Sequence, residues 1–230
     1  MLSVSLWFEF DDQMKLVVIS PEREDPREAA VLGGQLAAGL ECYHVRKPHW
    51  SARQLEAWLR ALPADWRPRL VLHSHHELAD QFGLGGRHWR DTGGEGRGVP
   101  AEPLKQAIPP HSLPYPGITS RSCHDLPTLR AALGRYDAVF FGPIFPSISK
   151  ADYGPSSDFS PKEVSMVLAQ RSVEERRTAV FALGGVAARN LLQIAALGFD
   201  GAAVLGAVWQ AADPLTAFHE LQNVLHAHAT

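Results

Sequence analysis

Short apolar runs alternate with amphipathic segments along the chain from Met14 onwards. Such runs are typical of parallel strands buried on both faces, and the segments between them have the periodicity of helices. Strands are predicted at residues 15–20, 41–46, 69–73, 86–89, 118–123, 138–141, 178–183 and 201–205. Helices are predicted at residues 26–40, 51–62, 76–82, 126–133, 161–170, 187–197 and 214–226. This alternation predicts an α/β fold, a (β/α)8 TIM barrel, with a doubly wound sheet as the alternative.

Two stretches fit this alternation less well. Residues 2–10 alternate apolar and polar side chains as a strand does, so residues 1–13 are predicted to form a short N-terminal extension. Residues 90–116 are rich in glycine and proline, and the helix expected there is shortened or missing. Because no linker-like composition divides residues 14–230, we expect a single barrel domain over that range.

The composition narrows the classes of partner. The chain has 230 residues, 45% of them hydrophobic, and a net charge of −3, which fits a globular domain with a sizeable core. That charge gives no reason to expect nucleic acid or a membrane as a partner. With two cysteines and no secretory signal, we expect a cytoplasmic protein. The sequence leaves the oligomeric state open, a homo-oligomer included.

Glycines follow each of the last two predicted strands. Gly184 and Gly185 come after residues 178–183, and Gly206 comes after residues 201–205, each directly before a helix. Glycine lets backbone N–H groups approach an anion, and a helix N-terminus favours negative charge. TIM barrels often bind phosphate at these two loops. The sequence therefore predicts a phosphate site there, with tight packing of helix on strand as the alternative.

The stretch after the strand at residues 138–141 is also a candidate for part of the functional site. The strand breaks at Gly142, and the loop that follows contains small hydroxyl residues and ends on the cation Lys150. A TIM barrel carries its chemistry at the carboxyl ends of its strands. We therefore predict that this loop borders the site, the alternative being an ordinary proline-rich turn.

Five of the 11 histidines fall in or just after predicted strands, toward the carboxyl ends: His44, His73, His75, His88 and His124. Imidazole titrates near neutral pH, so we expect at least one of them to act as an acid or base. The alternative for each is a polar residue at the barrel rim. His73 and His75 also have the spacing of two metal ligands on one strand, but no well-placed carboxylate lies beside them. We therefore predict no metal site.

Several of these stretches resemble motifs of one known superfamily. The segments VFFGPIFP at residues 139–146 with Lys150, ALGGV at 182–186 and DGAAVLGA at 200–207 resemble three motifs of the thiamine phosphate synthase and thiazole tautomerase superfamily. Residues 43–46, YHVR, and residues 122–125, SCHD, resemble two more. The resemblance runs in order from Met14 to the C-terminus and implies the same barrel fold.

The superfamily has two branches, and the chain departs from the synthase pattern. A synthase joins a pyrimidine pyrophosphate to a thiazole phosphate with Mg²⁺, using a Gln-x-Arg-x-Lys pattern on the second strand and Asn-Asp-Arg after the third. The matching residues here are His44, Arg46 and Pro48, then His73, Ser74 and His75. A hydroxyl cannot replace a carboxylate as a Mg²⁺ ligand. A synthase has a second metal-binding aspartate after the fourth strand, and Asp91 is the candidate for that position here, on a loose alignment.

The tautomerase branch often has histidine at the position of His44, and it moves a proton with a histidine that matches His124. The resemblance therefore implies a metal-independent tautomerase acting on a thiazole phosphate, a small heterocyclic phosphate, without a cofactor. Its alternatives are a Mg²⁺-dependent synthase and a non-catalytic regulatory protein that binds a thiazole or thiamine phosphate. The implied catalytic residues are His124 and His44. The implied ligand-binding residues are Arg46, Lys150, Gly184, Gly185 and Gly206. His73 and His75 match the pattern of neither branch and are candidates for additional site residues.

Overall fold

The computed structural model describes residues 14–90, 117–146, 148, 154 and 159–228. Three features of the sequence lie outside these ranges: the predicted extension at residues 1–13, the stretch at 91–116 and Lys150. What the sequence predicts for them stays a prediction.

Eight parallel strands close into a barrel in chain order, as the sequence predicts, and β1 pairs with β8 to complete it. The strands are β1 (Lys15–Ile19), β2 (Cys42–Val45), β3 (Leu70–Leu72), β4 (Gly86–Trp89), β5 (Ile118–Cys123), β6 (Ala138–Phe141), β7 (Ala179–Leu183) and β8 (Gly201–Val204). This architecture confirms the (β/α)8 barrel and rules out the open sheet that was the alternative.

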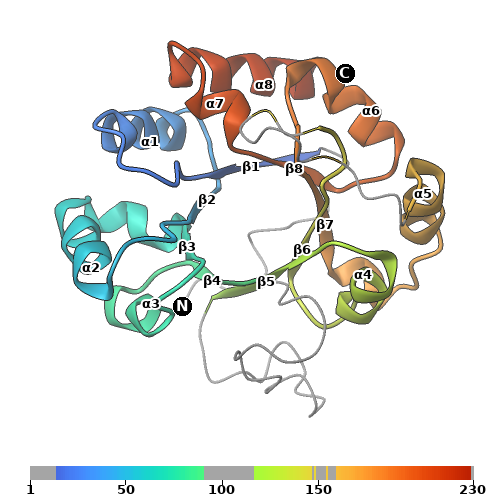
Figure 1. The fold of residues 1–230 in the computed structure, drawn as a ribbon, viewed down its shortest axis with the longest axis horizontal. Coiled ribbons are helices and arrows are strands. Elements are labelled where there is room, and N and C mark those ends of the chain that lie inside the picture. Colours follow the sequence, from blue (N-terminus) through green and yellow to red (C-terminus); the bar gives the residue numbers. More distant parts are fainter. Residues whose placement is uncertain (1–13, 91–116, 147, 149–153, 155–158, 229–230) are drawn as a thin grey trace.

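Helices form an outer ring around the closed sheet (Figure 1). The α-helices are α1 (Glu28–Ala37), α2 (Ala52–Ala61), α3 (Glu77–Phe82), α4 (Leu126–Ala132), α5 (Pro161–Ala169), α6 (Leu191–Ala196), α7 (Gly206–Trp209) and α8 (Pro214–His228). Short 3₁₀ turns are η2 (Ala64–Arg69), η4 (Glu175–Arg177) and η5 (Ala188–Asn190). Within the part of the chain that the structure describes, no helix is long and apolar enough to cross a membrane.

Alternation along each strand sorts side chains into two buried layers. On β1, Val17 and Ile19 belong to the cluster inside the barrel, while Val18 belongs to the larger cluster between strands and helices. Phe140 of β6 and Phe181 of β7 fill the interior, with ring centroids 5.5 Å apart. Strands buried on both faces read as nearly continuous apolar runs, which is why the sequence pattern located them.

Three details differ from the predicted elements. The strand predicted at residues 69–73 ends at Leu72, so His73 and His75 lie beyond it. The helix predicted at residues 187–197 divides into η5 and α6, because the Asn190 side chain accepts a hydrogen bond from Ala187 N and holds a tighter first turn. The short helix α7 was not predicted, since four residues are too few to show a helical period.

A buried ion pair ties α1 to the loop that follows β2. Lys47 Nζ lies 2.5 Å from Glu28 Oε2 and donates to the Pro21 carbonyl oxygen at 2.8 Å, and Tyr43 OH donates to Glu28 Oε1 at 2.9 Å. Burial raises the pKa of Glu28, and the charge and hydrogen bond of Lys47 oppose that rise. Because the neighbour of Lys47 is Arg46, this pair fixes the loop that carries Arg46.

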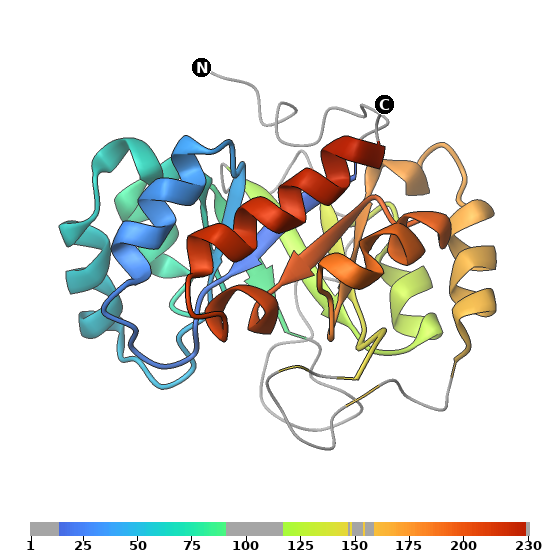
Figure 2. The same ribbon diagram turned by 90° about the horizontal axis from the view of Figure 1, so that it is seen from above.

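The pairing of β1 with β8 forms a seam that joins the first and last strands of the barrel. Leu16 pairs with Ala202, and the Trp209 indole N–H donates to the Ile19 carbonyl oxygen at 2.8 Å. Helix α8 crosses outside this seam, where it contacts α1, α6 and α7 (Figure 2). Strand β8, near the end of the chain, therefore closes the barrel against its first strand, β1.

Candidate functional site

A cavity of about 260 Å³ lies at the carboxyl ends of the strands, which is the catalytic end of TIM barrels. Loops or strand ends from every part of the barrel contribute to it. Its polar and charged lining residues are Glu22, Arg46, His73, Arg90, Ser122 and His124. The glycines of the predicted phosphate loops line the same cavity: Gly184, Gly185 and Gly206. Residues that lie far apart in the sequence thus come together in one site.

Two of the predicted site residues do not line this cavity. His44 lies beneath it, with 1% of its surface exposed, and contacts two residues that line it, His73 and Phe140. His75 turns away from it with a left-handed backbone, φ 54°, and its Nε2 lies 2.9 Å from the Trp50 carbonyl oxygen. The spacing of His73 and His75 along the sequence does not place them on one strand, because β3 ends before both.

The loop after β7 requires glycine at positions 184 and 185 for the cavity to keep its shape. Gly184 and Gly185 have φ values of 90° and 65°, a backbone conformation that other residues rarely adopt. A Cβ on Gly185 would lie 2.3 Å from the Pro146 carbonyl oxygen, and one on Gly184 would lie 2.6 Å from Pro143 Cβ. The glycines therefore bring the backbone of this loop against the loop after β6, as a cradle for a small anion requires.

Helix N-termini contribute less to this cradle than the sequence predicts. A 3₁₀ turn rather than an α-helix follows the Gly184–Gly185 loop, and α7, which begins at Gly206, has four residues. A short helix has a small dipole. Any phosphate bound here would therefore depend mainly on direct contacts with backbone N–H groups, and the phosphate site stays a prediction.

Replacing Gly185 with alanine is expected to weaken the binding of inorganic phosphate by roughly tenfold, because overpacking of this kind costs about 1–3 kcal/mol. The matched control is Gly83→Ala, since Gly83 has a nearly identical φ of 64° and no atom within 4 Å of the added Cβ. Calorimetric titration with phosphate measures both variants. Equal affinity in the two variants would contradict the cradle.

His124 presents one defined nitrogen to the cavity. Its Nδ1 lies 2.5 Å from the Gly142 carbonyl oxygen. A carbonyl can only accept, so Nδ1 carries the hydrogen and Nε2 of the neutral ring keeps its lone pair. The neighbouring Cys123 is fully buried in the layer between strands and helices, so the thiol and the imidazole are on opposite sides of the strand. This arrangement allows His124 to accept a proton from a ligand in the cavity.

Two guanidinium groups supply positive charge around the cavity. Arg46 forms an ion pair with Glu22, and Ser20 Oγ accepts a hydrogen bond from Arg46 N at 2.7 Å and fixes its backbone. Arg90 follows β4 and lines the same cavity. Lys150, the third predicted cation, lies outside the described ranges.

Three imidazoles form a buried cluster below the cavity. His44 Nδ1 lies 3.0 Å from His73 Nε2, and the rings of His73 and His88 stack with centroids 4.0 Å apart. His88 lies between two hydroxyls, with Nδ1 2.9 Å from Ser120 Oγ and Nε2 2.8 Å from Ser122 Oγ. We call His44, His73 and His88 the imidazole cluster.

Burial keeps the imidazole cluster neutral. It lowers the pKa of His44 to about 3, and it holds the pKa values of His73 and His88 well below the usual range, with the neighbouring imidazoles, Arg46 and Arg90 adding to the effect. The cluster therefore adds hydrogen-bonding groups near the cavity at neutral pH and no positive charge.

The sequence pattern places these histidines near strand ends but does not show that His44, His73 and His88 meet. Strand pairing supplies the signal, since His44 pairs with Val71 and Val71 pairs with Gly86. His73 and His88 each lie two residues beyond those partners, so the stagger of the barrel brings the three rings together.

The described part of the site does not fit Mg²⁺. Among the described lining residues Glu22 is the only carboxylate, and it is paired with Arg46. Mg²⁺ prefers oxygen ligands, and the imidazole cluster offers nitrogens. Ser74 stands where the synthase pattern has an aspartate, and Asp91 lies outside the described residues.

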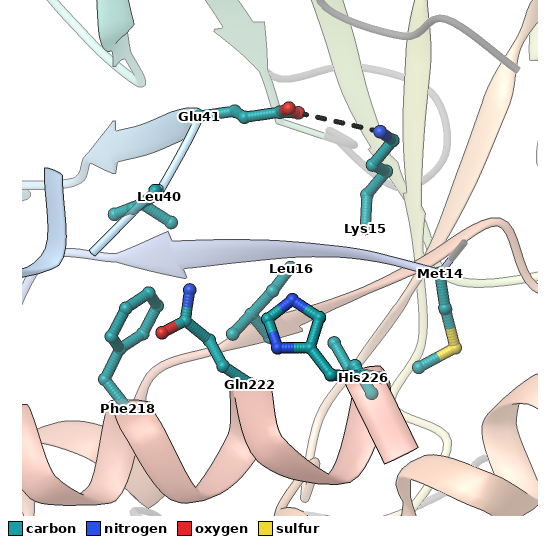
Figure 3. Close-up of a pocket in the computed structure, with 10 residues that line it drawn as sticks. Met14, Lys15, Leu16, Leu40, Glu41, Phe218, Gln222 and His226 are labelled. Atoms are coloured by element: carbon teal, nitrogen blue, oxygen red, sulfur yellow. Dashed lines mark ion pairs between the residues drawn. The ribbon is translucent and has the colours of Figure 1, made fainter. Parts of the chain in front are cut away.

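A second cavity, of about 170 Å³, lies at the amino-terminal end of the barrel between β1 and α8. In Figure 3, Phe218, Gln222 and His226 extend from α8 toward Leu16. Lys15 and Glu41 form a long ion pair at its edge, with 4.0 Å between Nζ and Oε2. Because TIM barrels carry chemistry at the opposite end, we assign no site here.

The sequence is similar to proteins of thiamine biosynthesis over most of its length. A family model described as thiamine monophosphate synthase matches residues 16–208. A putative thiamine-phosphate synthase of Geobacter sulfurreducens is 31% identical over 189 residues, which cover 80% of this chain and 81% of the relative. A thiamine-phosphate synthase of Listeria innocua is 24% identical, with 84% of this chain and 87% of the relative covered.

Solved structures with the same fold include two proteins described as thiamine phosphate pyrophosphorylases. The one from Bacteroides thetaiotaomicron superposes with a TM-score of 0.69 at 26% identity, covering 92% of this chain and 97% of that one. The one from Pyrococcus furiosus has a TM-score of 0.71 at 20% identity, covering 94% and 97%, a likeness of fold alone.

Proposed function

Because the chain belongs to the thiamine monophosphate synthase family, we propose that it joins a pyrimidine pyrophosphate to a thiazole phosphate. This is the alternative of the sequence analysis. The names of the relatives support it more than they support the tautomerase that the sequence pattern favoured.

One observation carries the proposal: a single cavity combines a glycine cradle with two guanidinium groups. Gly184 and Gly185 would hold the phosphate of the thiazole, while Arg46 and Arg90 lie on the other loops of the same cavity. When the two rings are joined, the pyrophosphate leaves with the electron pair of its bond to carbon. Fixed cations stabilise the charge that develops on such a leaving group.

No step of this proposal passes through Mg²⁺, because the described residues do not fit it. The remaining charge must come from Arg46, Arg90 and Lys150, the last lying outside the described ranges. We therefore expect turnover below that of a synthase that has the full Asn-Asp-Arg pattern.

The test is incubation of purified protein with the pyrimidine pyrophosphate and the thiazole phosphate, with and without Mg²⁺, followed by measurement of thiamine phosphate. Replacing Arg46 with glutamine is expected to lower the rate roughly 10²–10³-fold, the usual effect of losing one electrostatic contact. Arg60→Gln is the control, since Arg60 is exposed on α2, where it pairs with Glu56 and lies over the Phe82 ring. The absence of thiamine phosphate under all conditions would refute the proposal.

A second candidate, a thiazole tautomerase, is supported by the geometry of His124. His124 lines the cavity, its Nδ1 hydrogen bond leaves Nε2 as the nitrogen with a lone pair for proton transfer, and the reaction needs no metal. Incubation with the non-aromatic thiazole phosphate tautomer alone separates the two reactions. Aromatisation without thiamine phosphate formation would favour the tautomerase, and saturable binding without turnover of either kind would favour a regulatory protein.

A further inference from the structure

We propose that the imidazole cluster is a binding site for one transition-metal ion of the Zn²⁺ type, coordinated by His44, His73 and His88. The site lies between the carboxyl ends of β2, β3 and β4 and the floor of the large cavity. It goes beyond the proposed function, because neither reaction considered above uses a metal held by imidazoles.

The ring spacings support coordination by a common ion. One ring nitrogen from each histidine lies within 4.8 Å of the other two. Two imidazoles on one tetrahedral Zn²⁺ have ring centroids about 5 Å apart, because each Zn–N bond is about 2.0–2.1 Å. The His44–His73 and His44–His88 centroids are 5.2 and 5.4 Å apart, with interplanar angles of 81° and 76°.

The rings of His73 and His88 have to move apart before one nitrogen from each of the three histidines can bind the same ion. His73 and His88 stack at 4.0 Å, roughly 1 Å closer than a shared tetrahedral ion allows. His73 is the ring with room to move, because it borders the large cavity while His44 and His88 are enclosed. We therefore expect metal binding to shift His73 toward the cavity.

The chemistry of the cluster selects the class of ion. Buried neutral imidazoles suit Zn²⁺, Co²⁺, Ni²⁺ and Cu²⁺, whereas Mg²⁺ and Ca²⁺ require oxygen ligands. Metal-binding histidines usually donate their second ring N–H to a fixed acceptor. Both ring nitrogens of His88 contact hydroxyls, Nδ1 that of Ser120 and Nε2 that of Ser122, so one nitrogen must leave its serine to bind the ion while the other keeps its partner. The nearby charges of Arg46 and Arg90 oppose a cation, and Glu22 pairs with Arg46 and offsets part of that effect.

The position of the cluster leaves one coordination site for a ligand. Three histidines leave a fourth tetrahedral position, as in catalytic Zn²⁺ sites. Because His73 faces the cavity, that position would open toward bound substrate, where a water molecule or a phosphate oxygen would complete the coordination.

The test uses tag-free, chelator-treated full-length protein titrated with Zn²⁺, with bound metal measured by elemental analysis after desalting. We expect one ion per chain, and with Co²⁺ the visible absorption bands of tetrahedral coordination. His44→Gln and His73→Gln are each expected to weaken binding at least tenfold. The matched control is His75→Asn, because His75 neighbours the cluster in sequence but faces away, and asparagine tolerates its left-handed backbone.

Circular dichroism and thermal melting show whether each variant is folded. His73→Gln alone decides the result if the enclosed His44 variant unfolds. No uptake of Zn²⁺ or Co²⁺ at micromolar concentration by the wild-type protein would overturn the proposal. Unchanged one-to-one uptake in folded His73→Gln would do the same, since it would place the ion elsewhere.

Discussion

Lowering the pH from 7 to 5 is expected to reduce the unfolding free energy of the metal-free protein by about 2 kcal/mol through His44 alone, and His73 and His88 add to this loss. Free histidine titrates near pH 6.5, but burial holds the pKa values of His44, His73 and His88 lower in the folded protein. Below pH 6.5 the unfolded chain therefore binds protons that the folded chain does not, and stability falls as the pH falls. For His44 the loss continues to about pH 3, its folded pKa.

The surroundings of the imidazole cluster do not offset this loss. Arg46 and Arg90 oppose protonation of the rings, and the hydroxyls of Ser120 and Ser122 are neutral. Since most domains are stable by only about 5–15 kcal/mol, the expected loss is a large share of the total.

Urea unfolding at pH 7.5, 6 and 5 measures the effect. The double variant His44→Gln/His73→Gln should lose a large part of the pH dependence, whereas His226→Gln, at an exposed position on α8, should keep it. A double variant with the same pH dependence as the wild-type protein would show that other groups govern acid unfolding.

The variant His124→Gln is expected to lose roughly 10²–10⁴-fold in any turnover that requires proton transfer to or from a thiazole phosphate. Glutamine keeps a hydrogen-bonding side chain beside the Gly142 carbonyl oxygen but removes the titratable nitrogen. Because His124 borders the cavity, little change in folding stability is expected. The measurement is the rate of tautomer aromatisation, beside the rate of thiamine phosphate formation.

The two rates respond differently if His124 acts as the acid or base. Joining the rings depends chiefly on stabilising the pyrophosphate, so thiamine phosphate formation should fall much less than tautomer turnover. His226→Gln is the control, since His226 lies at the opposite end of the barrel. Unchanged aromatisation in His124→Gln would move the role to His73, the other histidine that lines the cavity.

The fold could be predicted from the sequence because most of the strands are buried on both faces. Runs such as residues 138–141 and 179–183 are apolar throughout, and helices of the chain begin at clear capping residues such as Ser51 and Ser160. Glycines whose backbone requires φ > 0, such as Gly185, were equally visible. These features are local, so one short stretch of sequence is enough to show each of them.

The candidate site was predictable only in part because it depends on contacts between strands. Alternation along one strand tells which side a residue faces, but the stagger between strands decides which residues meet. The partnership of His44 with His88 depends on that stagger, and the loss of His75 from the site depends on where β3 ends. Lys150 remains untested in its predicted role because it lies outside the described residues.

The seam between β1 and β8 has a consequence for how the protein is made. Lys15 pairs with Gly201, so the first strand of the barrel has no second neighbour until nearly the whole chain has been synthesised. During that time β1 exposes an unpaired edge that can bind other unfinished chains. Pairing of segments so distant in sequence is also slow, because a long loop has to close first. A nascent chain cut short before Gly201 is therefore expected to aggregate rather than fold, and chaperones that cover strand edges should raise the yield of the complete protein.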